Sequence, residues 1–174
     1  MLMVEKTNPG AESPIIFGNN MFIPRGWSYS LIIQQILVTQ KDFSGALFWD
    51  AGETSYEDLS ELLNYLDDFK GHFYPVIELS VWKEVSDWRW YALNFKYEMT
   101  GNNRICLSAR TENIDEAKVA QSWSGLPIVM DGFDNDFTDE QITLATRWYN
   151  VLMLICRKGL YKGELKGINY LLEK

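Results

Sequence analysis

The chain has 174 residues, of which 47% are hydrophobic and 23% are charged, as is typical of one globular domain. Its formal net charge of -8 argues against nucleic acid and anionic membranes as partners, because a protein that binds either must neutralise negative charge. Such a charge suits a basic partner protein, or a chain that is simply well solvated.

The first 14 residues, MLMVEKTNPGAESP, are mostly polar and contain two prolines and a glycine, so we expect a loose amino-terminal arm. They lack the basic start and the apolar run of a secretory signal. The longest apolar stretch, VLMLIC at 151–156, is too short to cross a bilayer. Cys106 and Cys156 lie in apolar runs and are expected to be buried free thiols, so we predict a cytoplasmic protein.

Two strands and a helix are predicted in the first 50 residues. The apolar runs IIF at 15–17 and GALFWD at 45–50 predict short strands. The stretch SYSLIIQQILVTQK predicts a helix over 28–41, because its apolar residues recur near the helical period. Ser28 or Ser30 can cap its start.

The clearest predicted helix covers 54–70. Thr54 and Glu57 have the spacing of a capping box, and Gly71 can end the helix as its carboxyl-terminal cap. One face is an apolar stripe of leucine and phenylalanine. The opposite face is acidic, with Glu57, Asp58, Glu61, Asp67 and Asp68.

From Pro75 onwards the apolar residues alternate with polar ones, in PVIELSVWKE, WRWYALNFKYEM and RICLSAR. A period of two is the period of a half-buried strand, and the short connections between these runs are rich in turn residues. The sequence therefore predicts an antiparallel β-meander over about 75–110.

The remainder predicts one or two helical turns at IDEAKVAQ, a strand at LPIVM, a helix over 138–158 and a final strand at INYLL. Thr138 and Gln141 match a second capping box, and Gly159 can end this helix. We find no internal repeat and no dividing linker. We therefore expect a single α+β domain over 1–174, with three main helices packed on the meander.

Catalytic and metal-binding patterns are not evident. His72 is the only histidine, it follows a predicted helix, and an ordinary turn role is expected for it. The acidic stretch DGFDNDFTDEQ does not fit a calcium loop, because a register starting at Asp134 has Asp139 where glycine is needed and Ala145 where glutamate is needed. We expect no catalytic residue, no bound metal and no cofactor.

Aromatic residues make up 14% of the chain. Alternation within the predicted meander places Trp82, Trp88 and Trp90 on its polar face, beside residues that include Glu78 and Arg110. Either the protein's own helices cover these rings, or the rings form a recognition patch, since aromatic anchors dominate interface energetics.

Acidic residues gather in two segments. In DGFDNDFTDEQ, Asp139 and Glu140 fall in the first turn of a predicted helix, where the macrodipole favours anions. Asp131, Asp134 and Asp136 precede the cap and have no such local use. With Glu57, Asp58 and Glu61, they are the candidates for an anionic docking surface, unless they are only solvated.

The acids of GETSYEDLSELLNYLDD and DGFDNDFTDE and the tryptophans of VWKEVSDWRW belong to a small acidic chain without catalytic residues. This overall profile resembles that of bacterial toxin-immunity proteins, such as those of contact-dependent growth inhibition systems. The resemblance implies that the chain binds a cognate toxin, with a basic nuclease as the expected kind, and occludes its active site. Carboxylates would steer the association, and buried aromatics would slow the release.

Two other classes of function stay open. One is an enzyme that uses its carboxylates on a sugar or through a metal. The other is a carbohydrate-binding or structural module in which Trp82, Trp88 and Trp90 act as stacking platforms.

Overall fold

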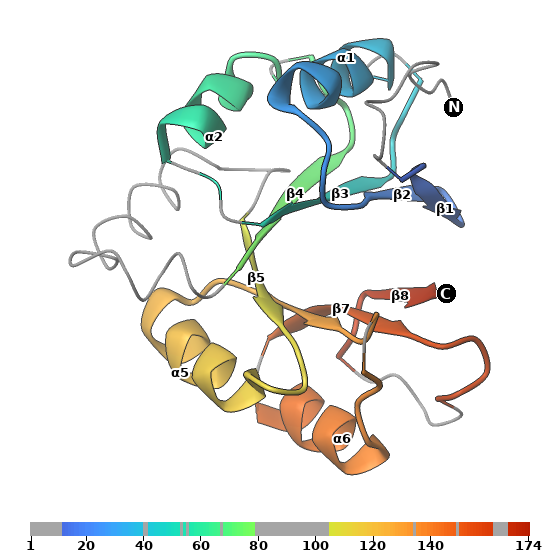
Figure 1. The fold of residues 1–174 in the computed structure, drawn as a ribbon, viewed down its shortest axis with the longest axis vertical. Coiled ribbons are helices and arrows are strands. Elements are labelled where there is room, and N and C mark those ends of the chain that lie inside the picture. The colour runs from blue at the N-terminus through green and yellow to red at the C-terminus, as the bar shows by residue number, and fades with distance from the viewer. Residues whose placement is uncertain are drawn as a thin grey trace. The chain divides into compact units, whose positions relative to one another are not determined.

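The computed structural model describes residues 12–39, 42–52, 54, 56–66, 68–78, 105–133, 135–148, 150–161 and 167–174. By their contacts these residues fall into two compact units (Figure 1). The first unit contains the described residues up to Val76 together with Ile105. The second contains Ile77, Glu78 and the described residues from Cys106 to Lys174. The single domain that the sequence predicts stays a prediction.

The first unit alternates strands with helices. Its elements are β1 (Ile15–Phe17), β2 (Asn20–Ile23), α1 (Tyr29–Thr39), β3 (Ala46–Gly52), α2 (Tyr56–Leu63) and β4 (His72–Ile77), the last residue of which belongs to the second unit. The strands lie in chain order. β1 pairs with β2 in antiparallel fashion, and β2 pairs with β3 in parallel.

Local signals explain where α1 begins. The Ser28 hydroxyl accepts a hydrogen bond from the Leu31 N–H at 3.3 Å, so Ser28 caps the helix as the sequence predicts. Leu31, Ile32 and Ile36 are buried on one side of the helix. α1 therefore packs on the strands through the apolar stripe that its period places there.

The two faces of β3 have different neighbours. The ring of Trp49 meets that of Tyr29 from α1 edge-on at a centroid distance of 5.4 Å, so Trp49 lies on the helix-covered face. The centroid of the Phe48 ring lies 5.0 Å from that of Tyr74 in β4 and 6.2 Å from that of Phe17 in β1. Because side chains alternate along a strand, Phe48 and Asp50 point to the face opposite α1.

The described residues of the second unit form four parallel strands and two helices. Its elements are β5 (Cys106–Ala109), α5 (Ile114–Ser124), β6 (Ile128–Asp131), α6 (Asp139–Trp148), β7 (Val151–Cys156) and β8 (Tyr170–Glu173). These strands also lie in chain order, and each pairs with the next in parallel. Its core joins strand residues such as Ala109, Met130 and Leu154 to Ala117 of α5 and Ile142 of α6.

The start of α6 confirms the second capping box. The Thr138 hydroxyl accepts a hydrogen bond from the Gln141 N–H at 3.1 Å, and the Gln141 side-chain oxygen accepts one from the Thr138 N–H at 2.9 Å. The predicted end of this helix at residue 158 is wrong. α6 ends at Trp148, Val151–Cys156 is strand β7, and Gly159 lies in a turn after β7.

The helix predicted over 54–70 is shorter in the structure, since α2 ends at Leu63. Leu66 and Phe69 are buried in the turns that follow the helix. Their spacing continues the apolar stripe in the sequence, which is why the predicted helix was too long. Gly71 does not cap the helix; it precedes β4, where a Cβ would lie 2.4 Å from the Gly45 carbonyl oxygen.

The predicted mixture of helices and strands is confirmed, but a purely antiparallel sheet is wrong. Among the strand pairings found between described residues, β1 with β2 is antiparallel and the other four are parallel. β5, the predicted end of the meander, pairs in parallel with β6. Residues 79–104, which form most of the predicted meander, lie outside the described residues.

Candidate functional site

Charged residues stand at the carboxyl ends of the strands in the second unit. Arg110 follows β5 directly, and Asp131 is the last residue of β6. The register pairs Ala109 with Met130, so the next step of the two strands sets Arg110 opposite Asp131. Ligands of parallel α/β sheets commonly bind at the carboxyl ends of the strands.

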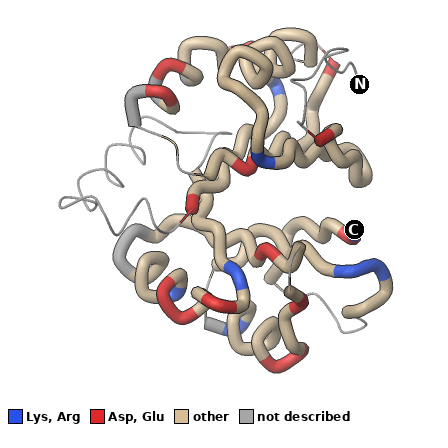
Figure 2. Tube along the Cα trace, viewed as in Figure 1, with Lys and Arg blue, Asp and Glu red and all other residues tan. Residues whose placement is uncertain are grey.

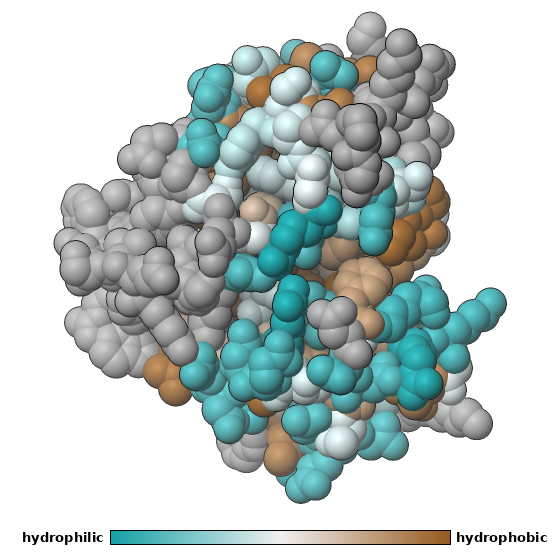
Figure 3. Space-filling model, in the orientation of Figure 1, coloured by the Kyte–Doolittle hydropathy of each residue, from teal (hydrophilic) through white to brown (hydrophobic). Residues whose placement is uncertain are grey.

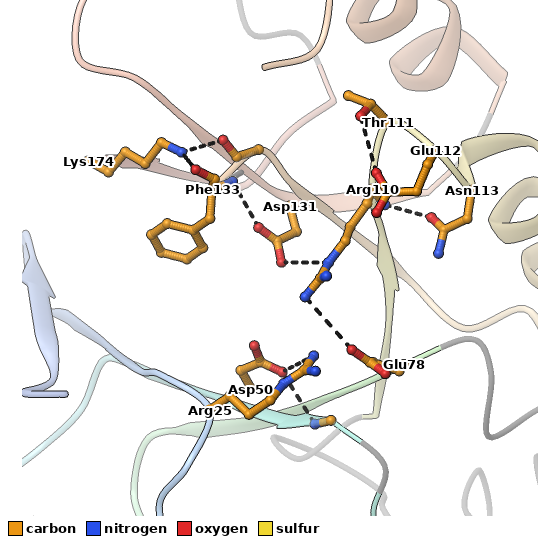
Figure 4. A network of polar contacts seen from close by, with 12 residues as sticks. Arg25, Asp50, Glu78, Arg110, Thr111, Glu112, Asn113, Asp131, Phe133 and Lys174 are labelled. Atoms are coloured by element: carbon orange, nitrogen blue, oxygen red, sulfur yellow. Dashed lines mark hydrogen bonds and ion pairs between the residues drawn. The ribbon is translucent and has the colours of Figure 1, made fainter. Parts of the chain in front are cut away.

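Arg110 lies between two carboxylates (Figure 4). Its Nε is 3.5 Å from Asp131 Oδ2, and its Nη2 is 3.7 Å from Glu78 Oε1, just past β4. The other oxygen of Asp131 accepts a hydrogen bond from the Phe133 N–H at 3.0 Å. The Arg110 N–H donates to the Asn113 side chain at 2.7 Å, which fixes the turn between β5 and α5.

The pair of Arg110 and Asp131 faces away from the helices. The preceding residues, Ala109 and Met130, are both in the core that packs against α5 and α6. Alternation along each strand therefore directs Arg110 and Asp131 to the opposite face. The Asp131 side chain is 9% exposed and that of Arg110 is 28% exposed, so solvent reaches the pair chiefly at the guanidinium.

The loop after β6 is held in place beside this pair. The Lys174 ammonium donates hydrogen bonds to the carbonyl oxygens of Gly132 and Phe133, and it lies 5.3 Å from the centre of the Phe133 ring. A Cβ on Gly132 would lie 2.4 Å from the Ile155 carbonyl oxygen, so this close approach requires glycine. The Phe133 ring is consequently fixed next to Asp131 (Figure 4).

Asp136 forms a second ion pair in the same loop. Its Oδ2 accepts a hydrogen bond from Arg157 Nε at 2.6 Å, and its Oδ1 is buried without a hydrogen-bond partner among the described residues. Nearby, burial raises the pKa of the Cys156 thiol, and the negative charges of Glu173 and Asp136 raise it further. Cys106 and Cys156 are both buried thiols outside any disulfide, as the sequence predicts.

The described residues of the predicted anionic surface belong to both units. Asp131 and Asp136 each form an ion pair with an arginine from another segment of the chain, which the sequence analysis did not predict. Asp58 and Glu61 are exposed on α2. The others lie outside the described part of the chain: the Glu57 side chain, Asp134, Trp82, Trp88 and Trp90.

Sequence reasoning treated Arg110 and Glu78 only as polar neighbours of the tryptophans. A usable signal was present, because RICLSAR, PVIE and PIVMD each end an apolar run on a charged residue. In parallel strands such positions meet at one edge, whereas the antiparallel pairing we expected would have separated them. His72, the only histidine, begins β4 and stacks on Tyr74 at a centroid distance of 5.8 Å.

The described residues contain no group of three or more histidine, cysteine, aspartate or glutamate side chains that could hold a metal ion. Among the same residues, no helix has the length and apolar content needed to span a membrane. Comparisons with protein-family models, with curated proteins and with solved structures find no match to this chain.

Proposed function

We propose that the second unit binds a small, neutral, polyhydroxylated ligand, such as a carbohydrate, at the carboxyl ends of β5 and β6. The observation that carries the proposal is Arg110 held between Asp131 and Glu78 at this edge. Parallel strands commonly present ligand-binding groups at their carboxyl ends, on residues that the sheet holds rigidly.

The chemistry of these side chains favours hydroxyl groups. A guanidinium only donates hydrogen bonds and a carboxylate only accepts them, whereas a hydroxyl does both. Vicinal hydroxyls can therefore bridge Arg110 and a neighbouring carboxylate. One positive and two negative charges make the cluster unfavourable for a phosphate or carboxylate ligand. The Phe133 ring offers an apolar surface beside it.

The test is a titration with neutral sugars. Glucose, galactose, mannose, N-acetylglucosamine, maltose and cellobiose are screened by saturation-transfer NMR, and the best binder is measured by calorimetry. Arg110→Gln should raise the dissociation constant about tenfold or more, the usual cost of an anchoring polar contact. The control is Arg147→Gln, which removes an exposed arginine from the last turn of α6, and it should bind as the unchanged chain does.

Saturation transfer from none of these sugars, or equal affinity in the Arg110→Gln protein, would contradict the proposal. Circular dichroism of each variant separates a lost contact from a lost fold. Arg110 is partly exposed, and its ion pairs with Asp131 and Glu78 are 3.5 and 3.7 Å long, so we expect its removal to leave the unit folded.

A second candidate is the toxin-immunity function, and one structural observation favours it. Exposed acids gather at the amino-terminal ends of α5 and α6 (Figure 2); they are Glu112, Asp115, Glu116, Asp139 and Glu140. Two nearby arginines, Arg110 and Arg157, are paired with carboxylates of the chain. The surface formed by these helices is predominantly hydrophilic (Figure 3).

If the chain is an immunity protein, electrostatic attraction should accelerate its association with the basic toxin. The partner to use is the cognate toxin, which is to be sought as a basic protein encoded beside the gene for this chain. The double variant Asp139→Asn/Glu140→Gln should associate several-fold more slowly at low salt, and the effect should be far smaller at high salt. Dissolved ions screen electrostatic steering beyond about 8 Å at physiological ionic strength. The matched control is the double variant Asp42→Asn/Asp68→Asn, which removes the charges of two exposed acids in the first unit. An association rate indifferent to salt would count against the candidate.

A further inference from the structure

The two units contain the same succession of elements. In the first unit it is β2, α1, β3, α2 and β4, and in the second it is β5, α5, β6, α6 and β7. In both, the strands lie in chain order, and the first strand pairs in parallel with the second. The sequence-based expectation of no internal repeat therefore needs to be revised.

Residue identities support this correspondence around the middle strand. The first unit has SGALFWDAG, in which β3 follows a Ser-Gly pair and contains Asp50. The second has SGLPIVMDG, in which β6 follows a Ser-Gly pair and ends on Asp131. In each case a threonine, Thr54 or Thr138, stands just before the next helix. A shared order of elements with shared residues is the signature of a repeat.

The first unit also carries an arginine–aspartate pair at the carboxyl ends of its strands. Arg25 follows β2, and its Nη2 lies 3.3 Å from Asp50 Oδ1. The same aspartate oxygen accepts a hydrogen bond from the Gly52 N–H at 3.2 Å. Gly52 has a φ of +57°, and a Cβ there would lie 3.1 Å from Arg25 Nε, so glycine lets the arginine side chain lie against the backbone.

The pair of Arg25 with Asp50 matches that of Arg110 with Asp131 in three respects. Each arginine follows the first strand of the repeated succession, β2 or β5, and each aspartate is on the next strand of that succession, β3 or β6. In both cases an aspartate oxygen accepts the N–H of the residue two positions later. Both aspartates point to the face opposite the helices, because Trp49 and Met130 lie on the helix-covered face.

The two pairs differ in the position of the arginine along its strand. The register places Asp50 opposite Pro24, so Arg25 lies one residue further along than its counterpart in the second unit. The Arg25 side chain is correspondingly more exposed, at 44% against 28% for Arg110. Arg25 nevertheless contacts Asp50, as Arg110 contacts Asp131. Both units therefore have the ion pair, although the loop that follows the first strand of the pair differs.

Fold stability does not account for two such pairs. Ion pairs that involve partly exposed side chains contribute little to stability, because solvent screens them and ordering the side chains costs entropy. Between the Ser-Gly pair and the aspartate, the first unit has ALFW and the second has LPIVM, so this apolar run differs in both length and sequence. The charged pair is thus retained where the packing residues are not, as expected of groups that contact a ligand.

We infer that the chain carries two equivalent ligand sites, one at Arg25 with Asp50 and one at Arg110 with Asp131, and that each takes one neutral polyhydroxylated molecule. This inference rests on the function proposed above for the second unit, and it adds a ligand site in the first unit. Both sites combine a donor guanidinium with an acceptor carboxylate, so they suit the same class of ligand.

The experiment follows two amide resonances during a titration of the ¹⁵N-labelled full chain with the sugar selected above. The Gly52 and Phe133 N–H groups each donate to the aspartate of one site, so their chemical shifts report on the two sites separately. Both should shift with added sugar, and calorimetry should give two molecules bound per chain. Arg25→Gln should abolish the Gly52 shift alone, and Arg110→Gln the Phe133 shift alone.

The outcomes distinguish this inference from the function on which it rests. One outcome is one bound sugar per chain, with a Phe133 shift that Arg110→Gln removes and no change at Gly52. That outcome would overturn the site at Arg25 with Asp50 and leave the site at Arg110 with Asp131 standing. A sugar titration without any shift at either amide would overturn both. A Gly52 shift that persists in the Arg25→Gln protein would show that the first unit binds elsewhere, which also contradicts the inference.

Discussion

Replacing Gly45 with alanine should destabilise the first unit by about 3 kcal/mol or more, in the range reached when a substitution forces a backbone clash in a packed region. A Cβ at this position would lie 1.9 Å from the Asn19 carbonyl oxygen and 3.1 Å from the Asn20 side-chain oxygen. The backbone has little room to move away. The Gly45 carbonyl oxygen accepts a hydrogen bond from the His72 N–H, and the following N–H, of Ala46, donates to Asn20.

The measurement is urea unfolding followed by tryptophan fluorescence, since Trp27 and Trp49 are both buried in the first unit. The control is Ser44→Ala, the neighbouring exposed residue, which should change the free energy of unfolding by less than about 0.5 kcal/mol. Equal unfolding midpoints for the two variants would mean that β2 and the start of β3 are further apart than described.

Phe48→Ala should cost about 3–5 kcal/mol, as expected for truncating a fully buried aromatic side chain. Phe48 is 0% exposed, and its ring packs against those of Phe17 and Tyr74. The substitution leaves a cavity between three strands, because the aromatic neighbours are held by their own backbone pairing.

The matched control is Ile16→Ala on β1. Ile16 is 48% exposed, so its truncation removes little buried area and should cost below about 1 kcal/mol. Both variants are compared by thermal and urea unfolding of the full chain. A loss for Phe48→Ala no larger than that for Ile16→Ala would place the Phe48 ring outside the core of the first unit.

Local signals in the sequence predicted the starts of helices well. Ser28 caps α1, and Thr138 with Gln141 forms the capping box of α6. These devices act within a few residues, so the sequence carries all the information that they need. The ends were harder to predict, because α2 stops at Leu63 although apolar residues continue at helical spacing.

The strand β7 shows why pattern alone failed further along. All six residues of Val151–Cys156 are buried, as is typical of a parallel strand covered on both faces. A run without alternation has no strand period, and it follows a real helix closely enough to be taken as its continuation. Only the pairing with β6 and β8, which is a long-range property, separates the two possibilities.

The candidate site escaped sequence analysis for a related reason. Arg110 and Asp131 come together because β5 and β6 run in parallel, and alternation in the preceding segment predicted antiparallel pairing. The sequence draws attention to the acidic residues of DGFDNDFTDEQ, but it does not predict the arginines that pair with Asp131 and Asp136. Arg110 and Arg157 lie in other segments, and no local rule connects them to these acids.

The same strand β7 makes the second unit vulnerable when it opens. Its sequence, VLMLIC, has six apolar residues with no charge, proline or glycine, which is the composition of segments that stack into cross-β fibrils. In the folded unit β8 covers one edge of it, through contacts that include the Lys174 N–H donating to the Cys156 carbonyl oxygen. Loosening this four-residue strand would uncover the β7 backbone, so refolding yield should fall as protein concentration rises.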